Sequence, residues 1–135
     1  MTSDAFNSSL RAYKDKGFFK ELKILRGIER ESLRIDNNGR ISQKNHPINL
    51  GSPLTNKNIT TDFAEALVEL VTPTFESPEA LFDQLNLLHR FVYSELDDEI
   101  LWNFSMPCAF TNEKEIRVAE YGNSNSGMLK HIYRK

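Results

Sequence analysis

The chain has 135 residues, of which 39% are hydrophobic and 27% are charged, with a net charge of −2. This length suits one domain with a modest core, and the composition argues against disordered, fibrous and repeat proteins. The small net charge and the spread of lysines and arginines give no indication of a nucleic-acid or membrane partner. With one cysteine, Cys108, and no signal-peptide pattern, we expect a cytoplasmic protein without disulfides.

The first half of the chain predicts a helix, a strand and a long loop. Residues 3–16 have the spacing of a short amphipathic helix. Residues 23–35 fit either a helix or a strand, and the turn signals on both sides favour the strand. Asn38-Gly39 then predicts a hairpin turn. The polar residues 42–58 predict a loop of the length that often carries function.

The second half contains the clearest helix. Residues 63–72 predict a buried strand, although residues 64–70 alone also fit a helix. In the helix predicted at residues 77–97, Ser77 is the expected cap. One face of that helix is apolar at helical spacing: Leu81, Leu85, Leu88, Val92 and Leu96. Residues 128–135 resemble the opening of a further helix without a stop signal, from which we expect a truncated sequence.

Five carboxylates lie inside the apolar segments 24–35 and 59–73, where an ionised carboxylate needs a partner: Glu29, Glu31, Asp62, Glu65 and Glu69. If both segments are strands, alternate glutamates share a face, and adjacent strands bring three or four carboxylates to one place. Charges of the same sign at that distance repel unless a cation is present. Oxygen ligands without histidine or cysteine favour Mg²⁺, Ca²⁺ or Mn²⁺.

A structural explanation competes with the metal site. Arg26, Arg30 and Arg34 alternate with the glutamates and can pair with them across strands. From the spacing alone, such a salt-bridge network is favoured over a metal site. Glu65 carries less weight than Glu69, because we expect it at the exposed start of its strand, and its role is left undecided.

The remaining candidates favour structural roles. Cys108 lies in an apolar segment and is expected to be a buried, inert thiol. His46, His89 and His131 are isolated from one another in the sequence, so no cysteine–histidine pair can be argued. The sequence contains no Walker-type loop or dinucleotide fingerprint. For residues 122–127 a plain surface turn is favoured over an anion-binding nest.

Residues 26–34 and 59–69 resemble the N-terminal part of glutamate–cysteine ligases (γ-glutamylcysteine synthetases) of the proteobacterial class. Further matching segments follow in order, so that the resemblance covers residues 20–135: Leu88-His89-Arg90, Trp102, Ser105-Met106-Pro107-Cys108 and residues 121–127. The resemblance implies the first step of glutathione synthesis. ATP phosphorylates the γ-carboxylate of L-glutamate, and the amine of L-cysteine then attacks the acyl phosphate.

The resemblance also implies a fold and a site. The expected fold is α+β, with an antiparallel sheet similar to that of glutamine synthetase, flanked by helices and incomplete in this chain. The metal-binding positions for Mg²⁺ or Mn²⁺ fall on four carboxylates: Glu29, Glu31, Asp62 and Glu69. The cysteine pocket falls on three residues, of which the arginine faces the substrate carboxylate: Phe63, Tyr133 and Arg134. No side chain is expected to act as a nucleophile, and for the glutamates the resemblance replaces the salt-bridge interpretation.

Members of this family are several times longer than this chain. We therefore expect residues 1–135 to be the N-terminal part of a single catalytic domain that is inactive by itself. The expected partners are L-glutamate, L-cysteine and ATP, with no nucleic acid and no membrane. The alternative is a non-catalytic metal- or nucleotide-binding or interaction module derived from such a ligase.

Overall fold

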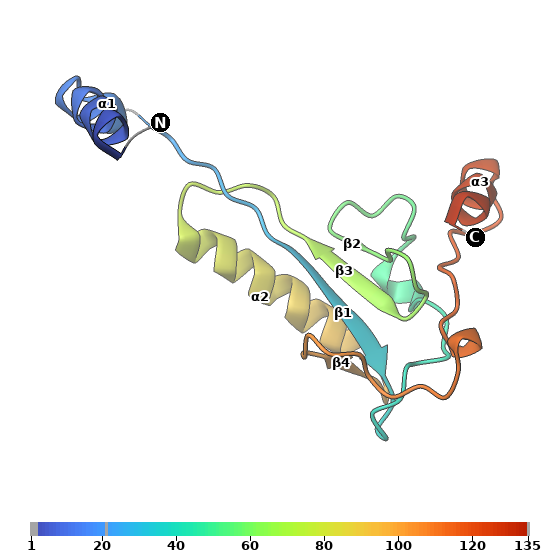
Figure 1. The fold of residues 1–135 in the computed structure, drawn as a ribbon. Helices are drawn as coiled ribbons and strands as arrows, with labels where there is room; N and C mark the ends of the chain where they lie inside the picture. Colours follow the sequence, from blue (N-terminus) through green and yellow to red (C-terminus); the bar gives the residue numbers. More distant parts are fainter. Residues whose placement is uncertain (1–2, 21, 135) are drawn as a thin grey trace.

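A four-stranded antiparallel sheet forms the centre of the computed structural model, which describes residues 3–20 and 22–134 (Figure 1). Its strands, in the spatial order β2-β3-β1-β4, are β1 (Glu29–Ile35), β2 (Ile59–Thr60), β3 (Leu67–Val71) and β4 (Ile100–Trp102). The helices are α1 (Ser3–Asp15), α2 (Pro78–Glu95) and α3 (Asn125–Arg134). The expected α+β fold with an antiparallel sheet and flanking helices is confirmed. None of the described helices is long and apolar enough to cross a membrane.

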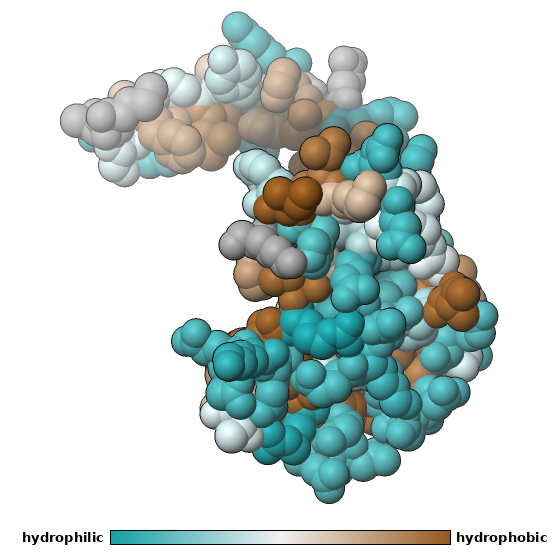
Figure 2. Space-filling model, turned by 90° about the vertical axis from the view of Figure 1, so that its right-hand side faces the viewer, coloured by the Kyte–Doolittle hydropathy of each residue, from teal (hydrophilic) through white to brown (hydrophobic). Residues whose placement is uncertain are grey.

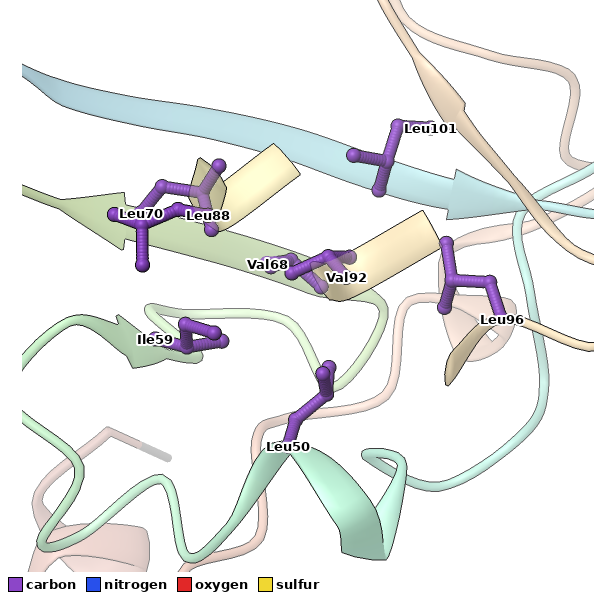
Figure 3. Close-up of a cluster of buried hydrophobic side chains, with 8 residues drawn as sticks. All are labelled: Leu50, Ile59, Val68, Leu70, Leu88, Val92, Leu96 and Leu101. Atoms are coloured by element: carbon purple, nitrogen blue, oxygen red, sulfur yellow. The ribbon is translucent and has the colours of Figure 1, made fainter. Parts of the chain in front are cut away.

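Helix α2 covers one face of the sheet. Ser77 caps it, because the Ser77 hydroxyl accepts a hydrogen bond from the Ala80 amide, and Pro78 occupies the first helical position. The buried side of α2 meets the strands in one apolar core, drawn in Figure 3: Leu50, Ile59, Val68, Leu70, Leu88, Val92, Leu96 and Leu101. The helix predicted at residues 77–97 and its apolar face are confirmed.

The packing of α2 fixes which side chains of β1 and β3 face the other side of the sheet. Val68 and Leu70 of β3 point into the core, so Glu69 between them points away from it. Glu31 of β1 lies directly opposite Glu69, whereas Arg30 lies opposite Leu70. The strand interpretation of residues 23–35 is confirmed for β1. Its glutamates lie on the open face and its arginines on the face that α2 covers.

Arg34 of β1 is a fully buried cation with several partners. Its Nη1 donates to both carboxylate oxygens of Glu99, at 3.0 and 2.9 Å, and the Glu99 side chain is itself buried. Its Nη2 donates to the backbone carbonyls of Lys44 and Glu65, each at 3.0 Å. Arg34 therefore ties β1 to the loop after the hairpin, to the segment before β3 and to the connection between α2 and β4.

The hairpin and the first helix agree with the sequence predictions. Gly39 has a φ of +75°, and Ile35 and Ile41 form an antiparallel bridge across the turn. Helix α1 is followed by Gly17, and no residue of α1 is buried. Figures 1 and 2 show α1 extending away from the sheet, with hydrophobic side chains along its surface.

Three boundaries differ from the sequence predictions. Strand β1 begins at Glu29 rather than at residue 23. Strand β3 begins only at Leu67, because residues 64–66 form a turn in which Ala64 bridges to Val118. The alternative of a helix over residues 64–70 is wrong. Helix α3 begins at Asn125 rather than at residue 128, because the Ser124 hydroxyl accepts a hydrogen bond from the Gly127 amide and caps its first turn. The surface turn expected over residues 122–127 therefore passes into a helix.

Replacing Arg34 by methionine should lower the free energy of unfolding by about 3–5 kcal/mol, because the substitution leaves the Glu99 carboxylate buried without its cation. Lys44→Met is the matched control. The ion pair of Lys44 with Asp98 is largely exposed, so its loss should cost at most about 1 kcal/mol. Urea denaturation of the two variants measures both values, and equal losses would contradict the role given to Arg34.

Candidate functional site

Four of the five sequence-predicted carboxylates gather near one another on the open face of the sheet. Glu29 and Glu31 alternate along β1, Glu69 lies across from Glu31 on β3, and Asp62 lies in the loop between β2 and β3. Partial burial, followed by the negative charges of Glu31, Asp62 and Glu29, raises the pKa of Glu69 above its ordinary 4.5. We refer to these four residues as the carboxylate cluster.

The arginines of the first apolar segment do not neutralise this cluster. Within residues 3–20 and 22–134, no ion pair joins Arg26, Arg30 or Arg34 to a glutamate of the cluster. Arg26 donates to backbone carbonyls, Arg30 donates to the Asn103 side chain and Arg34 pairs with Glu99. The salt-bridge network considered from the spacing is therefore wrong, because alternate residues of β1 face opposite sides of the sheet.

One cation reaches the cluster from the C-terminal helix. Arg134, in the last turn of α3, forms an ion pair with Asp62 at 2.6 Å between Nη1 and Oδ1. The positive charge of Arg134 lowers the pKa of Glu69, but the three carboxylates and burial outweigh it. A predicted metal ligand and a predicted cysteine-pocket residue are therefore in direct contact in this structure.

The structure brings together only part of the predicted cysteine pocket. Phe63 follows Asp62 directly in the chain, so its backbone lies beside the ion pair of Asp62 with Arg134, and its ring is half exposed. Tyr133 lies beside Arg134 in α3 but is 91% exposed. Phe63 and Arg134 thus share one region, whereas the described residues form no pocket wall against Tyr133.

Glu65 is a structural anchor and not a member of the cluster. It is 2% exposed, and its two carboxylate oxygens accept hydrogen bonds from the amides of His46 and Glu120, both at 2.7 Å. The expectation that Glu65 lies at an exposed strand start is wrong, because residues 64–66 form a buried turn. The alanines on both sides of Glu65 were the sequence signal for this burial.

Sequence reasoning missed Tyr121, which is 3% exposed although it opens a polar segment. Its hydroxyl donates to the carbonyl of Asp62 at 2.7 Å, and the ammonium of Lys130 lies 4.0 Å from the centre of its ring. No local pattern in the sequence predicts the contact with Asp62, because Tyr121 and Asp62 lie 59 positions apart in the chain.

His46 is partly buried and Cys108 is buried, and both lie outside the cluster. Burial, helped by the charge of Arg34, lowers the pKa of His46 to about 4. A pocket of about 500 Å³ opens beside His46, and no residue of the carboxylate cluster lines it. Cys108 packs among apolar side chains and burial raises the pKa of its thiol, so the predicted burial is confirmed and the inertness of the thiol stays a prediction.

The donors of the cluster fit a hard divalent cation. They are carboxylate oxygens on an accessible face, and partial burial, followed by their mutual repulsion, raises the pKa of Glu69. In the part of the chain that the structure describes, no group of three or more histidine, cysteine, aspartate or glutamate side chains is close enough to hold a metal ion. The structure thus gathers the donors without a formed ligand sphere, and the metal site stays a prediction.

Comparison with known proteins gives consistent matches over most of the chain. Residues 9–135 match the family model described as glutamate-cysteine ligase. The glutamate–cysteine ligase of Pseudomonas putida (strain W619) is 54% identical over 113 residues, which are 84% of this chain and 22% of that protein. The same enzyme of Bordetella petrii is 53% identical over 82% of this chain and 21% of its own length.

Solved structures agree with these matches. The glutamate–cysteine ligase of Francisella tularensis in complex with AMP has a TM-score of 0.77 and 44% identity, covering 82% of this chain and 22% of that one. A bifunctional glutathione synthetase from Pasteurella multocida has a TM-score of 0.66 and 35% identity, over 81% of this chain and 14% of that one. This chain therefore spans about a fifth of the length of the curated relatives that it matches.

The raised pKa of Glu69 should be visible in an NMR titration of its side-chain carboxyl, with a midpoint above 4.5. Glu31→Gln removes one negative charge across the strand pair and should shift the midpoint towards 4.5. Because Glu69 holds its proton more tightly in the fold, its ionisation lowers stability as pH rises from 4.5 to its folded pKa. Glu31→Gln should therefore be more stable than the wild type at neutral pH. An unchanged midpoint, as expected for the distant control Glu113→Gln, would show that the two charges do not interact.

The buried imidazole of His46 predicts a second pH dependence. Because the fold lowers the pKa of His46 from 6.5 to about 4, the unfolded chain binds a proton in this range and the folded chain does not. Stability should therefore fall as pH decreases from 6.5 to about 4. His46→Gln keeps the backbone amide that donates to Glu65 and should flatten this slope. Denaturation curves with the same slope in both proteins would argue against a neutral, buried His46.

Proposed function

The chain belongs to the glutamate–cysteine ligase family, and from this premise we propose that it forms one wall of a glutamate-activating site. The proposed reaction joins L-cysteine to the γ-carboxylate of L-glutamate with hydrolysis of ATP to ADP and phosphate, the first step of glutathione synthesis. The observation that carries the proposal is the carboxylate cluster, which is negative, accessible and free of the arginines of β1. The AMP complex of the Francisella ligase and the likeness to a glutathione synthetase support it.

The proposed chemistry needs placement and charge neutralisation more than a protein nucleophile. The γ-phosphoryl group of ATP passes to the γ-carboxylate of glutamate and ADP leaves. The amine of cysteine then attacks the acyl phosphate, the amide bond forms and phosphate leaves. Mg²⁺ or Mn²⁺, held by Glu29, Glu31, Asp62 and Glu69, supplies positive charge beside the phosphates when bound.

The residues of this chain serve that reaction through their fixed positions. Glu31 and Glu69 stand on paired strands whose other face is held by the apolar core, so their backbones are rigid. Arg134 offers a guanidinium that suits the carboxylate of the amino-acid acceptor, and Phe63 offers an apolar surface for its side chain. Tyr133 completes this proposed cysteine pocket from the exposed side of α3.

The length of the chain supports a role as one part of a longer catalytic domain. Because it spans about a fifth of its curated relatives, we propose that residues 1–135 act as the N-terminal part of one catalytic domain in the cytoplasm. By itself, the chain should bind divalent cations but form no product. The ligation needs groups that the remaining four-fifths of such a ligase supplies.

A chimeric ligase tests the proposal. Residues 9–135 replace the matching segment of the Pseudomonas putida enzyme, and formation of the γ-glutamyl–cysteine product is measured with ATP, glutamate and cysteine. The chimera should be active, the isolated chain inactive, and Glu31→Gln or Glu69→Gln should lower kcat by at least about 100-fold. Glu113→Gln, at an exposed position, is the matched control and should leave kcat unchanged. An inactive chimera, or full activity without the Glu31 and Glu69 charges, would refute the proposal.

A further inference from the structure

Tyr121 is buried at the junction of the two segments that carry the proposed acceptor groups. It is 3% exposed, although Glu120 and Gly122 on either side of it are exposed. Neither hydrophobic cluster of the described residues includes Tyr121. Its hydroxyl contacts backbone carbonyls and its ring contacts two cations, so it joins polar segments in addition to filling space.

The hydroxyl of Tyr121 contacts the loop between β2 and β3. It donates to the carbonyl oxygen of Asp62 at 2.7 Å, and the carbonyl oxygen of Thr61 lies 3.3 Å away. The adjacent amide of Ala119 donates to the carbonyl of Phe63 at 2.9 Å. The segment that contains Tyr121 therefore fixes the backbone from which the Asp62 carboxylate and the Phe63 ring project.

The ring of Tyr121 contacts α3. The Lys130 ammonium lies 4.0 Å and the Arg134 guanidinium carbon 5.7 Å from the ring centre, within the range of cation–π attraction. A methyl group on Gly127 would lie 2.5 Å from the Tyr121 carbonyl oxygen, so α3 approaches this segment as closely as its backbone allows. Both the ring of Tyr121 and the backbone at this position therefore pack directly against α3.

We propose that Tyr121 is a positioning residue for the amino-acid acceptor, an inference that rests on the proposed function. Through its hydroxyl it holds Asp62 and Phe63, and through its ring it holds Arg134, so it sets the separation of these groups. The ion pair between Arg134 and Asp62 lies where the two contacts meet. Tyr121 thus acts on affinity for the acceptor through Arg134 and does not touch the reacting atoms.

Tyr121→Phe in the chimeric ligase tests this inference, because it removes the hydroxyl and keeps the ring. The KM for cysteine should rise about tenfold, the effect of one lost hydrogen bond, while the KM for ATP changes by less than about twofold. Tyr121→Leu also removes the ring and should raise the KM for cysteine further. Tyr93→Phe, on the partly exposed side of α2, is the control and should change neither constant. Equal changes in the KM for cysteine and for ATP, or none, would overturn the inference.

A measurement without catalysis separates the inference from the proposed function. In the 135-residue chain, the NMR signal of the Arg134 side-chain Nε–H should move towards that of a free arginine in Tyr121→Leu, which removes both the ring and the hydroxyl. The amide signals of Asp62 and Phe63 should shift with it. If all three signals stay in place, Tyr121 does not position these groups. If they shift while the unsubstituted chimera is inactive, the positioning holds and the proposed function fails.

Discussion

The structure depends on one constraint, which is that a sheet covered by a helix on one face must present every second side chain to the other. Burial of Val68 and Leu70 against α2 leaves Glu69 on the open face. The antiparallel register then places Glu31 directly opposite Glu69. Two glutamates that repel each other are thus brought together by an apolar core to which neither contributes.

The buried charges of the molecule differ from those of the open face, because each buried charge has its own partners. Arg34 lies on the same strand as Glu31 but faces the opposite side of the sheet. There it donates hydrogen bonds to the Glu99 carboxylate and to two backbone carbonyls. Glu65 in turn accepts two backbone amides. These charges are matched inside the fold and do not neutralise the open face. Among the ion pairs of the described residues, one joins the carboxylate cluster to a cation, Arg134 of α3.

Local patterns in the sequence predicted the elements, but not the contacts between them. The 77–97 helix followed from its cap and its apolar spacing, and β1 from the turn signals around it. The alternation of side chains along a strand predicts that Arg34 and Glu31 lie on opposite faces. It does not predict which of the two faces is buried, because that depends on packing against α2. Glu65 and Tyr121 escaped prediction, because the hydrogen-bond partners that hold them lie between 19 and 60 positions away in the chain.

The central claim is that the open-face carboxylates form a cation-binding surface, and paramagnetic broadening by Mn²⁺ tests it most directly. In NMR spectra of the 135-residue chain, low concentrations of Mn²⁺ should first broaden the signals of Glu31 and Glu69 and leave those of the buried Glu65 sharper. Glu31→Gln should weaken that selective broadening. Uniform broadening, or broadening that begins at the surface acids of residues 113–115, would contradict the account.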